Sequence, residues 1–354
     1  ANRYLPLYIT RGVFRLKCYS TTMASAYSAL RISLCRISPF RASQFSYPAT
    51  FALARTNRIL CTSLHSASSS PSPSDLSSSS ASSSFPLMET NENPRWRPMC
   101  LYHTHGKCTK MDDPAHLEIF NHDCSKELRV TAADLERKKS QEFDFFLVLD
   151  LEGKVEILEF PVLIVDAKTM EVVDLFHRFV RPTKMSEQAI NKYIEGKYGE
   201  LGVDRVWHDT AIPFKKVVEE FEAWLAEHGL WSKQANGALN DAAFVTCGNW
   251  DIKTKIPEQC VVSNINLPQY FMEWINLKDV YLNFHGREAR GMVSMMRQCG
   301  IRLMGSHHLG IDDTKNITRV VQRMLGDGAV FKITARRSKS NLRNVEFLFK
   351  NRIK

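Results

Sequence analysis

The chain has 354 residues, 44% of them hydrophobic, and a formal net charge of +9. Its first 88 residues hold nine Lys and Arg against a single acid, Asp75, and therefore carry +8 of that charge, which leaves +1 for the rest. The basic balance thus says little about a nucleic-acid-binding surface in the remainder of the chain. No stretch approaches the roughly 18 to 20 apolar residues that a membrane-spanning helix needs, so we expect no membrane partner.

The N-terminal segment, residues 1–88, is predicted to be a disordered transit peptide and linker. It is rich in Ser, Arg and Ala, nearly free of acids, and contains a Ser/Pro tract at 66–84. Met23, followed by Ala-Ser-Ala-Tyr-Ser-Ala-Leu-Arg, suits the start of a plastid transit peptide. We therefore expect a chloroplast location, with the mitochondrion as the alternative because the spacing of Arg31 and Arg36 suits a mitochondrial presequence. A disordered tail without a targeting role is the other alternative.

Cysteine and histidine residues gather at 95–124, just before the folded core. Cys100, Cys108, His116 and His122 follow a C-x7-C-x7-H-x5-H spacing. Two thiolates and two imidazoles are a preferred ligand set for tetrahedral zinc, and so short a segment has little core of its own. We expect one structural Zn²⁺ here, with a metal-free helical hairpin as the alternative. Other ligands stay open, namely Cys124 in place of His122, and His103 or His105.

The second half of this segment, Asp-Pro-Ala-His-Leu-Glu-Ile-Phe-Asn-His, resembles the poly(ADP-ribose)-binding type of small zinc finger. The loop between the two cysteines is longer here than in that type. The resemblance is therefore taken to imply zinc binding alone, and docking of RNA is the role that we expect for the module.

The folded core is predicted to occupy residues 143–350 as an α/β domain. Short β-branched and aromatic runs predict strands, and apolar residues at helical spacing predict helices. Three consecutive strands with short links imply antiparallel pairing, and the later alternation of helix and strand implies a sheet of mixed direction. We expect a mixed five-stranded sheet flanked by helices, the architecture of ribonuclease-H-like nucleases. The expected strands are 143–152, 155–166, 172–180 and about 242–248, and the expected helices are 213–228, 288–299 and 314–325.

Two carboxylates, Asp150 and Glu152, end a strongly apolar strand and are separated by one residue. Because side chains alternate along a strand, both point to the same face of the sheet. Adjacent acids are costly to bury unless a cation neutralises them, so the pair predicts a divalent metal site. A solvated strand end is the alternative.

Three further residues follow the same logic. Asp251 comes directly after an apolar strand, in Cys-Gly-Asn-Trp-Asp, where an ordinary helix N-cap is the alternative. His308 and Asp313 lie five residues apart, before the helix expected at 314–325. A capping aspartate is common at such a place, whereas an imidazole brought there by a short Gly-containing turn is less common.

Taken together, these residues resemble the DEDDh exonucleases, which carry Asp-x-Glu, a later Asp, and then His-x4-Asp. The similarity is greatest to the enhanced-RNAi and three-prime histone mRNA exonuclease family, through His-Leu-Gly-Ile-Asp-Asp-Thr-Lys-Asn at 308–316, Glu-Phe-Pro at 159–161 and Asn-Trp-Asp at 249–251. This resemblance implies a 3′-to-5′ exonuclease with two Mg²⁺ or Mn²⁺ ions roughly 3.5 to 4 Å apart, one activating water and the other stabilising the leaving 3′ oxygen. The ligands it implies are Asp150, Glu152, Asp251 and Asp313, with His308 as the general base.

The His-x4-Asp spacing selects His308 over His307, and Asp313 over Asp312, which is left as a cap or a supporting group. Leu151 and Trp250 adjoin the acids and are expected to hold the terminal nucleotides by apolar contact and stacking. Core packing is the alternative for Trp250. The family usually has Ala-Thr-Cys-like residues after its first motif, whereas this chain has Gly153 and Lys154. Lys154 is expected either to contact a substrate phosphate or to be exposed to solvent.

The expected function is the trimming of single-stranded or overhanging RNA 3′ ends to nucleoside monophosphates. Ribosomal RNA precursors (rRNA processing) and small-RNA duplexes (RNA silencing) are the expected substrates. A DNA proofreading or repair exonuclease is one alternative, and an RNA-binding adaptor without catalysis is another, which the intact set of five residues disfavours. The sequence predicts no oligomeric state. A basic cluster near the C-terminus is expected to bind the phosphate backbone or to form a solvated loop between two strands, and comprises Arg336, Arg337, Lys339 and Arg343.

Overall fold

The computed structural model describes residues 96–234 and 237–353. The description below concerns the compact unit that contains these residues, 85–354. The predicted transit peptide and linker at 1–88 lie outside the described residues. Among the helices that are described, none has the length and apolar character to cross a membrane.

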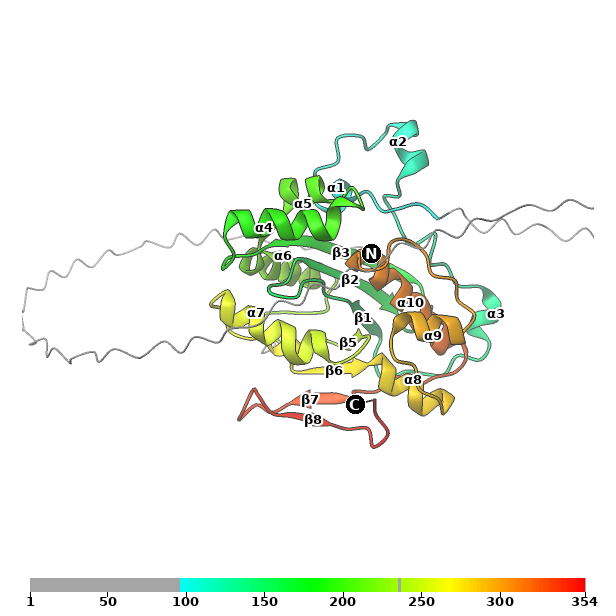
Figure 1. Ribbon diagram of the computed structural model, residues 1–354. Coiled ribbons are helices and arrows are strands. Elements are labelled where there is room, and N and C mark those ends of the chain that lie inside the picture. Colours follow the sequence, from blue (N-terminus) through cyan, green and yellow to red (C-terminus); the bar gives the residue numbers. More distant parts are fainter. Residues whose placement is uncertain (1–95, 235–236, 354) are drawn as a thin grey trace, which may run out of the picture. The chain divides into compact units, whose positions relative to one another are not determined.

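The unit is built on a mixed sheet whose strands lie in the order β4-β3-β2-β1-β5-β6-β7-β8. β1 pairs antiparallel with β2 on one side and parallel with β5 on the other. The β7–β8 hairpin forms one edge of the sheet, beside β6 (Figure 1). The strands are β1 (Phe145–Leu149), β2 (Glu159–Asp166), β3 (Val172–Arg181), β4 (Ile212–Pro213), β5 (Ala242–Thr246), β6 (Glu273–Asn276), β7 (Ala335–Arg337) and β8 (Val345–Phe347).

The sheet thus has eight strands in the described residues, and the expected number of five was wrong. Its centre, β3-β2-β1-β5-β6, does have the five-stranded mixed arrangement that the sequence predicts. The additional strands β4, β7 and β8 have only two or three residues each. Strands this short give no readable alternation of apolar and polar residues, so their pairing with the main sheet was not predicted, although two strands around the C-terminal basic cluster were considered.

Helices cover both faces of the sheet (Figure 1). A hydrophobic core lies on each face of the sheet, and alternate side chains of β1 pack into one or the other. Phe146 and Val148 lie in the first core, and Leu147 and Leu149 lie in the second. The first layer contains α4, α5, α8, α9 and α10, and the second contains α6 and α7. These helices are α4 (Glu187–Ile194), α5 (Asp204–Thr210), α6 (Phe214–Glu227), α7 (Ile256–Val262), α8 (Leu277–His285), α9 (Met292–Gln298) and α10 (Gly310–Gly326).

The observed helices differ from the expected ones chiefly at their starts. α10 begins at Gly310, four residues before the predicted 314, so that Asp313 lies in its first turn. α9 begins at Met292 rather than 288. Two π-helical turns, η1 (Glu195–Gly199) and η2 (Asp251–Lys255), were not expected at all.

The segment before the nuclease sheet belongs to the same compact unit. It contains the short helices α1 (Leu101–Thr104), α2 (Pro114–Ile119) and α3 (Ala132–Leu135). The segment that connects it to the nuclease sheet, 125–141, packs against α10. Glu127 of this connector forms an ion pair of 2.6 Å with Lys315, and both side chains are almost fully buried. The connector is therefore part of the fold rather than a loose tether.

The C-terminal basic cluster is largely used within the fold. Arg337 is buried, and its guanidinium donates hydrogen bonds to the backbone carbonyls of Ile252 and Lys253. Arg336 pairs with Glu273 at 2.9 Å. Arg336 and Arg337 lie in strand β7, so the expected solvated loop between two strands holds only Lys339 and Arg343.

Candidate active site

Parallel pairing of β1 with β5 brings Asp150 and Asp251 together. Asp150 directly follows β1, and Asp251 follows β5 after a four-residue link. The carboxyl ends of neighbouring parallel strands meet at one edge of a sheet, so both side chains arrive at the same place. The Leu151 amide donates to the Asp251 carboxylate at 3.1 Å, which fixes Asp251 against the end of β1. Asp251 is thus held by tertiary contact and does not act as an ordinary N-cap.

Helix α10 supplies the third part of the cluster by packing across β2 and β1. Carboxylate oxygens of Asp150, Glu152 and Asp313 lie within 4.8 Å of one another, which is close enough to share a metal ion. The approach is close because residue 310 is glycine. A Cβ atom there would lie 3.0 Å from Cδ of Glu159 and 3.1 Å from Cγ of Glu152.

The acids of the cluster repel one another in the absence of a cation. Burial and the nearby carboxylates of Asp251, Asp313 and Glu152 hold the pKa of Asp150 well above its usual range. Burial also raises the pKa of Glu152 to about 7 and that of Asp251 to about 6. Buried carboxylates with raised pKa values are a donor set that a hard divalent cation such as Mg²⁺ would neutralise, so these residues fit the expected metal.

Both histidines of the pair His307 and His308 lie beside Asp313. The His308 amide donates to Asp313 at 2.8 Å, and His308 adopts a left-handed backbone with φ of 72°. Nδ1 of His307 lies 3.0 Å from each carboxylate oxygen of Asp313, and the two imidazole rings stack at 3.9 Å. Burial and the neighbouring His307 lower the pKa of His308, so its ring is neutral at pH 7 and able to accept a proton. The contact of His307 with Asp313 was not foreseen.

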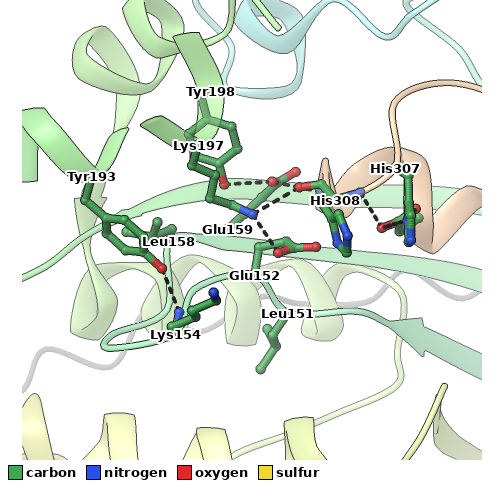
Figure 2. Close-up of polar contacts among 12 residues, drawn as sticks. Leu151, Glu152, Lys154, Leu158, Glu159, Tyr193, Lys197, Tyr198, His307 and His308 are labelled. Atoms are coloured by element: carbon green, nitrogen blue, oxygen red, sulfur yellow. Dashed lines mark hydrogen bonds and ion pairs between the residues drawn. The ribbon is translucent and has the colours of Figure 1, made fainter. Parts of the chain in front are cut away.

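Lys197, which sequence analysis missed, also lies in this cluster. Its ammonium group is 2.7 Å from the Glu152 carboxylate and donates to the His308 carbonyl at 3.1 Å (Figure 2). Lys197 comes from the π-helical turn η1, and Asp251 begins the other π-helical turn, η2. Such turns are frequent at functional sites, but no residue pattern in the sequence signals them.

Glu159 is a second residue whose role was missed, although its Glu-Phe-Pro motif was noted. Its side chain is completely buried and accepts hydrogen bonds from the amides of Gly310 and Ile311 at 3.0 and 2.8 Å. These two N–H groups lie in the first turn of α10 and have no carbonyl partner within the helix, and a carboxylate is favoured at such a place. Glu159 therefore anchors the helix start that carries His308 and Asp313.

Two residues of the 308–316 motif hold the loop that precedes α10. Asp312, left by the sequence as a cap or supporting group, accepts from the Ser306 amide at 2.8 Å. Asn316 donates to the Met304 carbonyl at 2.7 Å. The motif therefore combines a ligand candidate, Asp313, with residues that shape the turn carrying His308.

The three residues expected to contact substrate differ in exposure. Trp250 is 45% exposed beside Asp251, so part of its ring is available for stacking, although the Lys255 ammonium lies over the ring at 5.3 Å. Leu151 is only 5% exposed and packs in the core beneath the sheet, which leaves little surface for a nucleotide. Lys154 is exposed. Its backbone amide donates a hydrogen bond to the Tyr193 hydroxyl at 2.8 Å (Figure 2).

The second group of metal-ligand candidates is the one predicted at 95–124. Ligand atoms of Cys100, Cys108, His116 and His122 lie within 4.8 Å of one another. Nε2 of His116 and of His122 are 3.6 and 3.7 Å from the Cys108 sulfur. The alternative ligands are outside this group, since Cys124 is buried in the nuclease core, His103 stacks on His122, and His105 packs on Phe179.

A family model described as Exonuclease (RNase_T) matches residues 144–321. The chain therefore belongs to the exonuclease family, whose members hydrolyse phosphodiester bonds, and the matched range includes all four acids of the site and His308. An uncharacterized exonuclease domain-containing protein of Arabidopsis thaliana is 86% identical over 337 residues, which are 94% of this chain and 100% of that protein.

Two human enzymes confirm the resemblance that the motifs indicated. ERI1 exoribonuclease 3 is 32% identical over 206 residues, or 55% of this chain and 58% of that protein. The enzyme 3′-5′ exoribonuclease 1 is 28% identical over 218 residues, or 57% of this chain and 58% of that protein. The chain thus spans less than two thirds of either human enzyme.

Among solved structures, the nuclease domain of 3′hExo, a DEDDh family member bound to rAMP, is 27% identical. It matches 54% of this chain and 96% of that domain, with a TM-score of 0.46.

Proposed function

We propose that the protein is a 3′-to-5′ exoribonuclease that uses two Mg²⁺ or Mn²⁺ ions to release nucleoside monophosphates from RNA. The observation that carries the proposal is the convergence of Asp150, Glu152 and Asp313 within 4.8 Å, with Asp251 held against the same strand end. The names of the human relatives, both exoribonucleases, favour RNA over the alternative of a DNA proofreading or repair enzyme. The intact cluster disfavours a catalytically silent adaptor.

The four acids would hold the metal ions, and the neutral ring of His308 would act as general base. When bound, the ions would activate the attacking water and stabilise the charge on the leaving 3′ oxygen. His308 is exposed, and its ring would take up the proton of that water. Lys197 ties Glu152 to the backbone of His308, and His307 and the His308 amide orient Asp313.

The proposed substrates are single-stranded or overhanging RNA 3′ ends, in ribosomal RNA precursors or small-RNA duplexes. A free 3′ end can enter a site of this kind without base-specific contacts, because stacking on an exposed ring such as Trp250 suits any base. The proposed location is the chloroplast, with the mitochondrion as the alternative, and its support is the acid-poor composition of residues 1–88.

The function is tested with labelled RNA and DNA oligonucleotides that carry the same 3′ overhang. We expect Mg²⁺-dependent release of mononucleotides from RNA, and a lower rate on DNA because the 2′-OH is the group that distinguishes the two. Asp150→Ala should abolish the reaction while leaving the fold intact. Equal or greater activity on DNA would favour the repair enzyme, and activity that survives Asp150→Ala would refute the site.

We also propose that Cys100, Cys108, His116 and His122 bind one structural Zn²⁺. Two sulfur and two nitrogen ligands at mutual distances below 4.8 Å suit tetrahedral zinc. Metal analysis of the purified protein should find one zinc ion per chain, and Cys108→Ser should lose it. Cys299→Ser, a half-buried cysteine outside the group, is the matched control and should keep it.

A further inference from the structure

A buried chain of polar contacts joins the Cys/His module to the active site. Besides the two α10 amides, the Glu159 carboxylate contacts the Tyr198 hydroxyl and Nε2 of His177, each at 3.1 Å. Burial alone would raise the pKa of Glu159, but the hydrogen bonds from His177, Gly310 and Ile311 outweigh it and hold the pKa below its usual value. The Glu159 carboxylate is therefore held by four contacts beneath the start of α10.

The other nitrogen of the His177 ring points to the module. His177 is completely buried, and its Nδ1 lies 2.8 Å from the hydroxyl of Thr104. Thr104 is the last residue of α1, the helix that starts directly after Cys100. Contacts thus run without a break from a zinc-ligand candidate through Thr104, His177 and Glu159 to the helix that carries Asp313.

The loop between the two cysteines is the part of the module that docks on the nuclease. The Thr104 carbonyl accepts from Arg178 at 2.7 Å, and the Tyr102 hydroxyl donates to Asp209 at 2.6 Å. The His105 ring stacks on Phe179 at 5.4 Å, and burial lowers its pKa to about 2, so it docks as a neutral ring. The greater length of this loop, noted in the sequence, thus supplies the residues that contact β3 and α5.

The opposite side of the module has little packing to hold it. Helix α2 buries none of its residues, and its His116 belongs to the metal-ligand group. A segment of this kind keeps its shape through the metal rather than through a core. Loss of zinc would therefore release the Cys108 end of the docking loop, and with it the fixed position of Thr104.

We propose that the zinc-bound module is a positioning element of the exonuclease, which holds Glu159 through Thr104 and His177 and so fixes the N-terminus of α10. Thr104 and His177 are positioning residues, because neither lies within the acidic cluster. The inference builds on the proposed function, since the geometry that it maintains is that of His308 and Asp313.

The experiment compares Thr104→Val, Thr104→Ser and Thr109→Val in the full chain. Val keeps the volume of Thr104 but removes its hydroxyl, Ser restores the hydroxyl, and Thr109 is an exposed residue of the same module that serves as control. The measurements are zinc content, amide hydrogen exchange of the peptide 305–313, and kcat and KM on RNA at saturating Mg²⁺. Thr104→Val should keep its zinc, exchange faster at 305–313, and lose about 10- to 100-fold in kcat with KM unchanged. Thr104→Ser and Thr109→Val should match the wild type.

Cys108→Ser completes the test by removing zinc while the Thr104 side chain itself is unaltered. It should show the same faster exchange at 305–313, and Cys299→Ser should not. Unchanged exchange in Thr104→Val, or in the zinc-free protein, would overturn the inference whatever the activity is. A wild-type protein that fails to degrade RNA would instead overturn the proposed function, because the exchange measurement needs no turnover.

Discussion

The acidic cluster and the Cys/His module are both groups of metal-ligand candidates, but they are held in opposite ways. The acids lie at the ends of β1 and β5 and at the start of α10. Two large hydrophobic cores hold these elements together, and their packing offsets the free-energy cost of bringing like charges close. The Cys/His ligands come from 23 consecutive residues with few buried side chains. The acidic cluster should therefore form without its metal and work only with it, whereas the Cys/His module should need its metal in order to fold.

The largest expected effect follows from removing one acid. Asp150→Asn should lower kcat on RNA on the order of 10⁴-fold or more, because it removes a ligand of the catalytic metals. The same change removes a charge that repels Asp251, Asp313 and Glu152, so the thermal unfolding midpoint in Mg²⁺-free buffer should rise or stay level. A clear fall in that midpoint would show that repulsion among the carboxylates does not destabilise the metal-free protein.

Replacing His308 and His307 one at a time should give the next largest effects on kcat. His308→Ala should cost about 10² to 10⁴-fold in kcat as the loss of a general base. His307→Ala removes only a contact that orients Asp313, and should cost about 10- to 100-fold. Single-turnover rates measured across the pH range distinguish them, since only the His308 variant should lose the ionisation of the base. A larger loss for His307→Ala would reverse the assignment.

In the Cys/His module, removing a metal ligand should affect folding first, whereas in the acidic cluster it should affect catalysis first. Cys108→Ser should open the segment before it affects the nuclease core, because zinc binding supplies on the order of 10 kcal/mol of folding free energy in small zinc modules. Limited digestion with trypsin should then cut faster at Lys107 and Lys110. Cys299→Ser should show the wild-type pattern, and equal cutting in both variants would mean that the module folds without zinc.

The smallest effect is a pH dependence of stability in the absence of Mg²⁺. The folded protein raises the pKa of Glu152 from 4.5 to about 7 and that of Asp251 from 3.8 to about 6. The folded state therefore binds more protons than the unfolded state in this window, and the free energy of unfolding contributed by these groups falls as pH rises from about 4 to about 7. Thermal unfolding midpoints at several pH values measure this slope. Added Mg²⁺ should raise the midpoint at pH 7.5 or so, but little near pH 5, where protons compete with it.

The sequence predicted those parts of the site that depend on local pattern. Alternation along β1 places Asp150 and Glu152 on one face, and the five-residue step from His308 to Asp313 spans the start of α10. Neither result needs knowledge of distant parts of the chain.

The parts that could not be predicted depend on contacts between distant segments. Lys197 reaches Glu152 only because a π-helical turn and the packing of η1 aim it there. The role of Glu159 depends on a helix that begins 151 residues later. Likewise, Leu151 has the right place in the sequence for a nucleotide contact, but core packing covers its side chain.

The close packing around residue 310 limits which variants of this enzyme can exist. A Cβ atom at that position would lie 3.0 to 3.3 Å from Glu159, Glu152 and the Asp150 carbonyl, so these groups or the helix itself would have to shift by a few tenths of an ångström. A complete set of substitutions across 309–311, selected for activity, should therefore return glycine alone at 310. The room for adaptation to new substrates then lies in the rim around the cluster, at exposed positions such as Lys154 and Trp250, and not in the turn that sets the distance between helix and sheet.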